Sequence, residues 1–145
     1  MCFTLYAGAS ITLPLIEWNK DQPAIHTTNL QDYELGVLTR FTLPYVLYIG
    51  SDQRCGCGFR HALADGKNWL PVVGDDKDDL DAIQKNQMGL WQYLTDNAAG
   101  DSIEIYACWN GDVYDCSDCI SDIGIDDIVN EDFYFKEGWL YKVAV

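Results

Sequence analysis

The sequence is poor in basic residues, and this shortage limits what the protein can bind. It contains 9 Lys and Arg residues against 23 Asp and Glu residues, which gives a formal net charge of −14 at pH 7. A chain with this balance repels phosphate backbones and anionic membrane surfaces, so we expect neither nucleic-acid binding nor membrane association. The same negative charge favours solubility, and it would attract a basic protein partner.

The chain also lacks long apolar runs and the signatures of common catalytic sites. No apolar run approaches the roughly 18 residues that a membrane-spanning helix requires. The segment 1–6 has neither the basic region nor the apolar core of a signal peptide, so we expect a cytoplasmic protein with reduced thiols. Glycine-rich nucleotide-binding loops, the Gly-x-Ser-x-Gly elbow and the His-Glu-x-x-His zinc motif do not occur.

The apolar content, in contrast, is high enough for a folded core. Hydrophobic residues make up 48% of the 145 residues and aromatic residues 13%, which excludes a disordered chain. A chain of this length fits one domain, 1–145. Extended segments are expected at 2–8, 24–28, 44–50, 59–64, 69–73 and 102–108, with a closing pair of strands at 133–135 and 139–145.

One long helical pattern at about 78–98 accompanies these strands. Leu80, Ile83, Leu90, Trp91 and Leu94 recur at spacings of three and four residues, so we expect this stripe to pack on the sheet. The acidic run at 75–79 lies where a helix dipole favours negative charge, and it lacks the ligand spacing of a calcium loop. The sequence therefore predicts an α+β fold: a mixed or mostly antiparallel sheet, this helix, and shorter helices packed on it.

The strongest candidate site combines two close cysteine pairs. Cys55 and Cys57 are separated by one glycine, and Cys116 and Cys119 by two residues. Zinc prefers four tetrahedral ligands, and two close pairs on separate loops commonly supply them. Both pairs follow predicted strands, whose loops can meet at one end of a sheet. The sequence therefore predicts a zinc site made by these four cysteines. If 55–61 is extended, His61 shares one face with Cys55 and Cys57, and these three could bind the metal with one cysteine of the second pair.

The cysteines also allow interpretations without metal. Reduced cysteines pack as small apolar side chains, and two close pairs allow a disulfide if their Cα atoms approach within about 7 Å. The carboxylates around Cys116 and Cys119 disfavour a redox motif of the thioredoxin type there. Removal of Met1 would expose Cys2 as an N-terminal nucleophile whose own amine serves as the base.

A reactive thiol is the enzymatic alternative. Cys55 lies close in sequence to Arg54, Arg60 and His61, so its neighbourhood is locally basic. Nearby positive charge lowers the pKa of a thiol, and a histidine can act as its general base. This pattern describes a small thiol-dependent enzyme in which Cys55 works with His61.

Together these features favour a non-catalytic acidic interaction protein with a candidate structural zinc site and a basic protein partner. The alternative is the thiol-dependent enzyme that uses Cys55 and His61. The two hypotheses differ in what should surround Cys55. The enzyme requires an open, positively charged pocket there, whereas the interaction protein requires a continuous acidic face.

Overall fold

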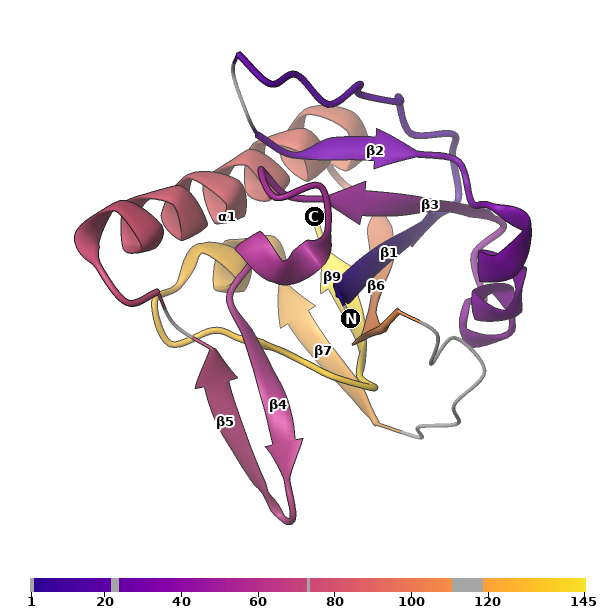
Figure 1. Cartoon of the computed structure of the whole chain (residues 1–145). Helices are drawn as coiled ribbons and strands as arrows, with labels where there is room; N and C mark the ends of the chain where they lie inside the picture. Colours follow the sequence, from indigo (N-terminus) through magenta and orange to yellow (C-terminus); the bar gives the residue numbers. More distant parts are fainter. Residues whose placement is uncertain (1, 22–23, 73, 111–118) are drawn as a thin grey trace.

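Two β-sheets and one long helix dominate the part of the chain that the computed structural model describes, namely residues 2–21, 24–72, 74–110 and 119–145. The larger sheet has the strand order β2-β3-β1-β6-β9-β7, and the smaller has the order β5-β4-β8 (Figure 1). Neighbouring strands are antiparallel except for the parallel pairs β7–β9 and β4–β8. The predicted α+β class with a mixed sheet is confirmed.

The element boundaries agree with the sequence pattern to within a few residues in most cases. The larger sheet contains β1 (Phe3–Ala9), β2 (His26–Thr28), β3 (Tyr45–Gly50), β6 (Ser102–Trp109), β7 (Ile120–Gly124) and β9 (Leu140–Ala144). The smaller sheet contains β4 (His61–Asp65), β5 (Asn68–Val72) and β8 (Phe135–Lys136). The helices are α1 (Lys77–Ala98) and the 3-10 helices η1 (Asp32–Arg40), η2 (Gly56–Gly58) and η3 (Ile125–Val129). Within the described ranges, no helix is long and apolar enough to cross a membrane.

Strand β1 lies near the centre of the larger sheet, and every residue in it is buried. Because side chains alternate along a strand, Leu5 faces the core that contains Leu90 and Leu94 of α1. Tyr6 faces the opposite side, where it packs in a second cluster with Val37 of η1. Helices α1 and η1 therefore cover opposite faces of the larger sheet.

The buried stripe of α1 differs in part from the predicted one. Leu90 and Leu94 are fully buried, as predicted. Leu80, however, is 51% exposed, and Ile83 and Trp91 are only partly buried. The expectation that the whole apolar stripe is buried against the sheet is therefore wrong for Leu80, Ile83 and Trp91.

Two polar residues of α1 occupy the middle of its buried side instead. The Asn86 side-chain nitrogen donates to the Gly58 carbonyl oxygen at 2.9 Å, and the Gln87 side-chain nitrogen donates to the Ile128 carbonyl oxygen at 2.6 Å. Gln87 also accepts the backbone N–H of Arg60 at 3.2 Å. Loop backbone groups that are buried against a helix need such partners, which explains why amides replace apolar side chains here.

The expected closing pair of strands does not form a hairpin. β8 pairs in parallel with β4 in the smaller sheet, whereas β9 pairs with β6 and β7 in the larger one. The chain turns between them at Gly138, whose φ of +77° favours glycine. This turn takes the chain from the smaller sheet to the larger one. The extended segments expected at 59–64 and 69–73 form β4 and β5, which pair as an antiparallel hairpin around Gly66.

Candidate metal centre

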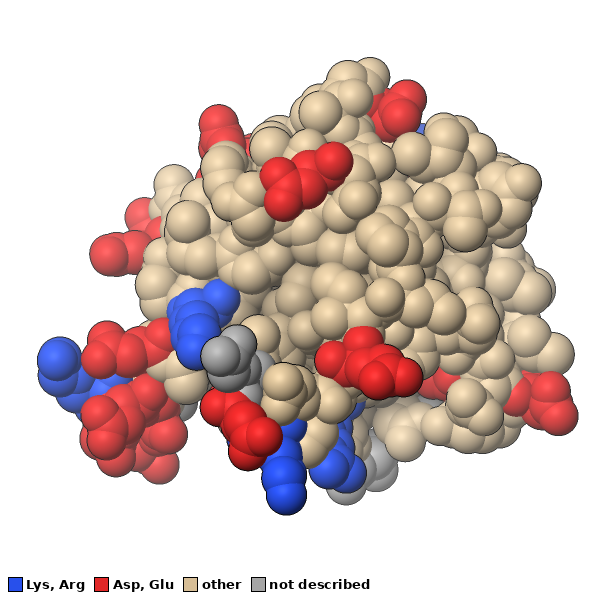
Figure 2. All heavy atoms as spheres, turned by 90° about the horizontal axis from the view of Figure 1, so that it is seen from above, with Lys and Arg blue, Asp and Glu red and all other residues tan. Residues whose placement is uncertain are grey.

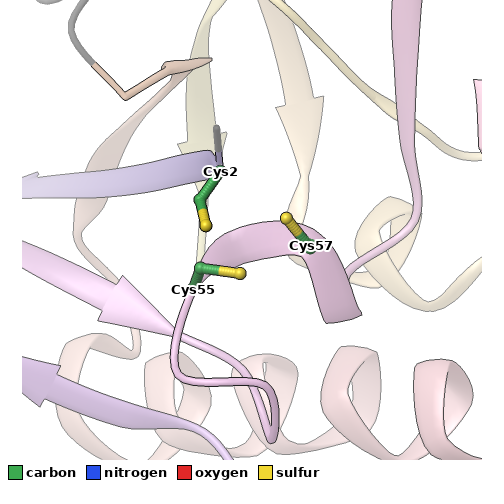
Figure 3. Close-up of side chains that lie close together, drawn as sticks. All are labelled: Cys2, Cys55 and Cys57. Carbon is green, nitrogen blue, oxygen red and sulfur yellow. The ribbon is translucent and has the colours of Figure 1, made fainter.

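Three cysteine sulfurs lie together where the beginning of β1 meets η2. The Sγ atoms of Cys2, Cys55 and Cys57 all lie within 4.8 Å of one another. Figure 3 shows Cys2 at the start of β1, Cys55 and Cys57 on the η2 turn, and the three sulfurs around a shared space. All three are free thiols, with Cys2 exposed and the other two partly buried. A zinc ion bonded to sulfur at about 2.3 Å places its sulfur ligands about 3.8 Å apart, so this spacing suits a metal ion.

Ser51 organises the loop that carries Cys55 and Cys57. This residue is fully buried, and both its backbone N–H and its hydroxyl donate to the Cys55 carbonyl oxygen, at 2.8 and 2.6 Å. The hydroxyl oxygen also accepts the backbone N–H groups of Gly58 and Gln53, at 3.1 and 3.2 Å. These bonds connect both ends of the loop to one side chain, so the cysteines are positioned by the fold itself.

Contacts made by Arg54 stabilise the turn that precedes Cys55. Its φ of +70° is unusual for a residue other than glycine, and the surrounding contacts maintain it. The guanidinium carbon lies 3.9 Å from the centre of the Trp18 ring, and the Tyr48 hydroxyl donates to the Arg54 carbonyl oxygen at 3.0 Å. Trp18 also donates its ring N–H to the Asp52 carbonyl oxygen at 3.1 Å. The turn is thus held on two sides.

Gly56 allows this loop to approach β1 closely. A Cβ atom at this position would lie 2.9 Å from the Phe3 carbonyl oxygen and 3.2 Å from the Thr4 Cα atom. The backbone N–H of Phe3 donates to the Cys57 sulfur at 3.3 Å. Hydrogen bonds of this kind orient a metal-binding sulfur and stabilise negative charge on it. The close approach therefore serves the cysteine group directly.

The two arginines that the sequence places near Cys55 are both engaged with other side chains in the structure. Arg54 stacks on Trp18, and Arg60 is buried and donates to the Gln84 side chain at 3.1 Å. Burial raises the pKa of the Cys55 thiol, and its hydrogen bond to Cys57 adds to this rise. A raised pKa is the opposite of what an activated nucleophile needs.

His61 lines the same cavity as Cys57, and it is not in the close group of Cys2, Cys55 and Cys57. Its ring stacks on the Phe3 ring with 4.3 Å between the centroids, and its Nδ1 donates to the Phe59 carbonyl oxygen at 2.8 Å. Burial lowers the pKa of His61, so the ring is neutral at pH 7 and its Nε2 is an acceptor. His61 and Cys57 line one cavity of about 440 Å³, whereas Cys55 and Cys2 line another of about 240 Å³. The Cys55–His61 pair stays a prediction.

The second cysteine pair of the predicted zinc site is described only in part. Cys116 lies outside the described residues. Cys119 precedes β7, is exposed, and accepts the backbone N–H of Leu140 at 3.0 Å through its carbonyl oxygen. Among the residues that the structure describes, the close cysteine group contains Cys2 and not Cys119. The four-cysteine ligand set therefore stays a prediction.

Sequence reasoning missed Cys2 as a partner of Cys55, although one signal for it was present. The sequence predicts strands at both 2–8 and 44–50, and adjacent antiparallel strands place the start of one beside the end of the other. The register pairs Leu5 with Ile49, so Cys2 and the loop after β3 share one end of the sheet. These two strands were not paired from the sequence, and Cys2 was therefore not placed near Cys55.

Comparison with known proteins adds no family to this geometry. No protein-family model, curated protein or solved structure matches the chain.

Proposed function

We propose that the protein is a non-catalytic interaction domain that binds a zinc ion through Cys2, Cys55 and Cys57. The observation that supports it is the convergence of three free thiols within 4.8 Å from segments far apart in the sequence. Thiolate ligands select soft ions, among them Zn²⁺ and Cu⁺. Zinc is proposed because a structural role requires no redox chemistry.

The bound ion would connect the beginning of β1 to the η2 turn. Ser51 and Asn86 already hold the loop that carries Cys55 and Cys57, so the metal adds the link to Cys2. The unfolded chain contains no preassembled site, and zinc binding therefore stabilises the folded state by mass action. Three thiolates and one Zn²⁺ carry a net charge of −1, which is a small addition to a chain of net charge −14.

Metal content of single variants tests this ligand set. The protein is purified under reducing conditions without added metal, and zinc is measured by elemental analysis before and after zinc titration. We expect about one zinc ion per chain in the wild type and a loss of zinc in Cys2→Ser, Cys55→Ser and Cys57→Ser. Cys119→Ser is the matched control and should retain zinc. Loss of zinc in Cys119→Ser with retention in Cys2→Ser would favour the two-pair site instead.

The distribution of acidic residues supports the interaction part of the proposal. Acidic atoms gather at the left of the face in Figure 2, the side on which α1 begins in Figure 1, with basic atoms beside them, while much of this face is uncharged. Asp76, Asp78 and Asp79 at this end of α1 are exposed. In the described ranges the only ion pair joins Lys77 to Asp81 at 3.7 Å, and both side chains are exposed. The acidic end of α1 is thus open to a basic partner.

A thiol-dependent enzyme is the second candidate, because Cys57 and the neutral His61 line the same cavity. The residue in question is Cys57 rather than Cys55. Alkylation of Cys57 by iodoacetamide, followed by mass spectrometry between pH 6 and 9, tests the pair. If His61 acts as the base, His61→Gln slows alkylation near pH 7. Equal rates in the wild type and the variant would exclude this function.

A further inference from the structure

The zinc site proposed above has three protein ligands among the described residues, whereas zinc takes four. Glu34 and Tyr48 line the cavity next to Cys2 and Cys55, and both side chains are already engaged. Glu34 accepts the Tyr6 hydroxyl at 3.0 Å through one oxygen and the backbone N–H of Gln31 at 2.8 Å through the other. The Tyr48 hydroxyl donates to the Arg54 carbonyl oxygen. The Glu34 carboxylate does not belong to the close group of metal-ligating atoms.

A cavity leads to the cysteine group from the β2 side of the molecule. It has a volume of about 240 Å³, and both Cys2 and Cys55 line it. Its other walls are polar and include Thr28, Gln31 and Asn110. The backbone N–H of Asn110 donates to the Cys2 carbonyl oxygen at 2.8 Å, which holds the cavity wall against the first ligand. An external ligand can therefore reach Cys2 and Cys55 through this space, whereas Cys57 lines the other cavity.

Charge limits what that ligand can be. Zinc with three thiolates is a net anion, and the buried carboxyl group of Glu34 lines the same cavity. No Lys, Arg or His is among the described residues that line it. An anionic ligand would meet like charge in a partly desolvated space, whereas a neutral donor would not.

Resting on the proposed zinc function, we infer that the fourth coordination position is open to this cavity and takes a small neutral donor of the imidazole class. Water, whose share of liquid volume is about 30 Å³, fits the cavity in the absence of such a ligand. An imidazole ring is also small enough for the space of about 240 Å³. The ring can come from a free small molecule or from a histidine of a partner protein.

Cobalt-loaded protein tests this inference, because Co²⁺ adopts the zinc geometry and its visible absorption reports its ligands. The loaded protein is titrated with imidazole, with a short histidine-containing peptide, and with azide at matched ionic strength. We expect imidazole to shift the visible bands saturably and azide to leave them unchanged. A response to the peptide as well would identify a partner histidine as a source, and a response to imidazole alone a small molecule.

Cavity variants provide the structural control. Thr28 is exposed and lines the cavity, so Thr28→Phe should weaken imidazole binding at least tenfold while cobalt still binds. Thr12 is also exposed but lines a different cavity, and Thr12→Phe should bind imidazole like the wild type.

The outcomes separate this inference from the zinc function. Failure to bind cobalt would overturn both. Cobalt binding with no response to imidazole, or with equal binding of azide, would overturn only the open neutral site. A weaker thiolate-to-cobalt charge-transfer band in Cys116→Ser would mean that a fourth protein thiolate occupies the position, which would also overturn the inference.

Discussion

Substitution of Gly56 by alanine should disturb both the fold and the cysteine group. The added Cβ atom would lie 2.9 Å from the Phe3 carbonyl oxygen and 3.2 Å from both the Phe3 carbonyl carbon and the Thr4 Cα atom. All three are backbone atoms of the beginning of the buried β1, so no side-chain rotation relieves the overlap. The η2 turn must move away from β1 instead. Overpacking of this kind costs about 1–3 kcal/mol, and we expect a loss near the middle of that range.

The same movement should weaken metal binding. A shift of η2 lengthens the 3.3 Å hydrogen bond from the Phe3 N–H to the Cys57 sulfur and separates Cys2 from Cys55. Stability is measured by urea unfolding of the metal-free protein in the presence of a chelator. Zinc affinity is measured separately by competition with a coloured chelator, and we expect it to fall at least tenfold.

Gly89→Ala is the matched control. A Cβ atom at Gly89 would lie 3.4 Å from the nearest Ile25 carbon, which is an ordinary contact, and Gly89 is inside α1. Alanine is favoured over glycine in a helix interior by about 1 kcal/mol, so this variant should be as stable as the wild type or more stable and should bind zinc normally. If Gly56→Ala matches the wild type in both assays, the close approach of η2 to β1 is refuted.

Three further predictions concern stability and binding. Leu94→Ala should lower the free energy of unfolding by about 2–5 kcal/mol because Leu94 is fully buried. Leu80 is exposed, so Leu80→Ala should change this free energy by less than about 0.5 kcal/mol. Comparable losses for the two variants in urea unfolding would contradict the packing of α1. Burial lowers the pKa of both His26 and His61, so protonation favours the unfolded state. Their contribution is fully present above about pH 6.5 and is lost as the pH falls below it, and His26→Gln/His61→Gln should show a weaker decline between pH 7.5 and 5.5. Binding of a basic partner should weaken as salt rises from about 0.1 to 1 M, where the Debye length falls from about 10 to 3 Å, and salt-independent binding in a titration would exclude the acidic surface as the main contact.

The local pattern of the sequence determined most secondary structure. Strand alternation located β1, β3 and β6, and the helical spacing located α1 to within one residue at its start. These periodicities depend on neighbours a few residues apart, so they can be recognised without tertiary information. The chemistry of the loop was equally local, because Cys55 and Cys57 are separated by one residue and were predicted to act together.

Tertiary structure decided everything that depends on which distant segments meet. The two closing strands, β8 and β9, belong to different sheets, and the polar Asn86 and Gln87 are buried because loop backbone groups need their amides. Cys2 joins Cys55 and Cys57 only because β1 and β3 pair in an antiparallel register. The free energy of such contacts comes from burial and hydrogen bonding between remote parts of the chain. A local periodicity does not identify which remote segments become partners.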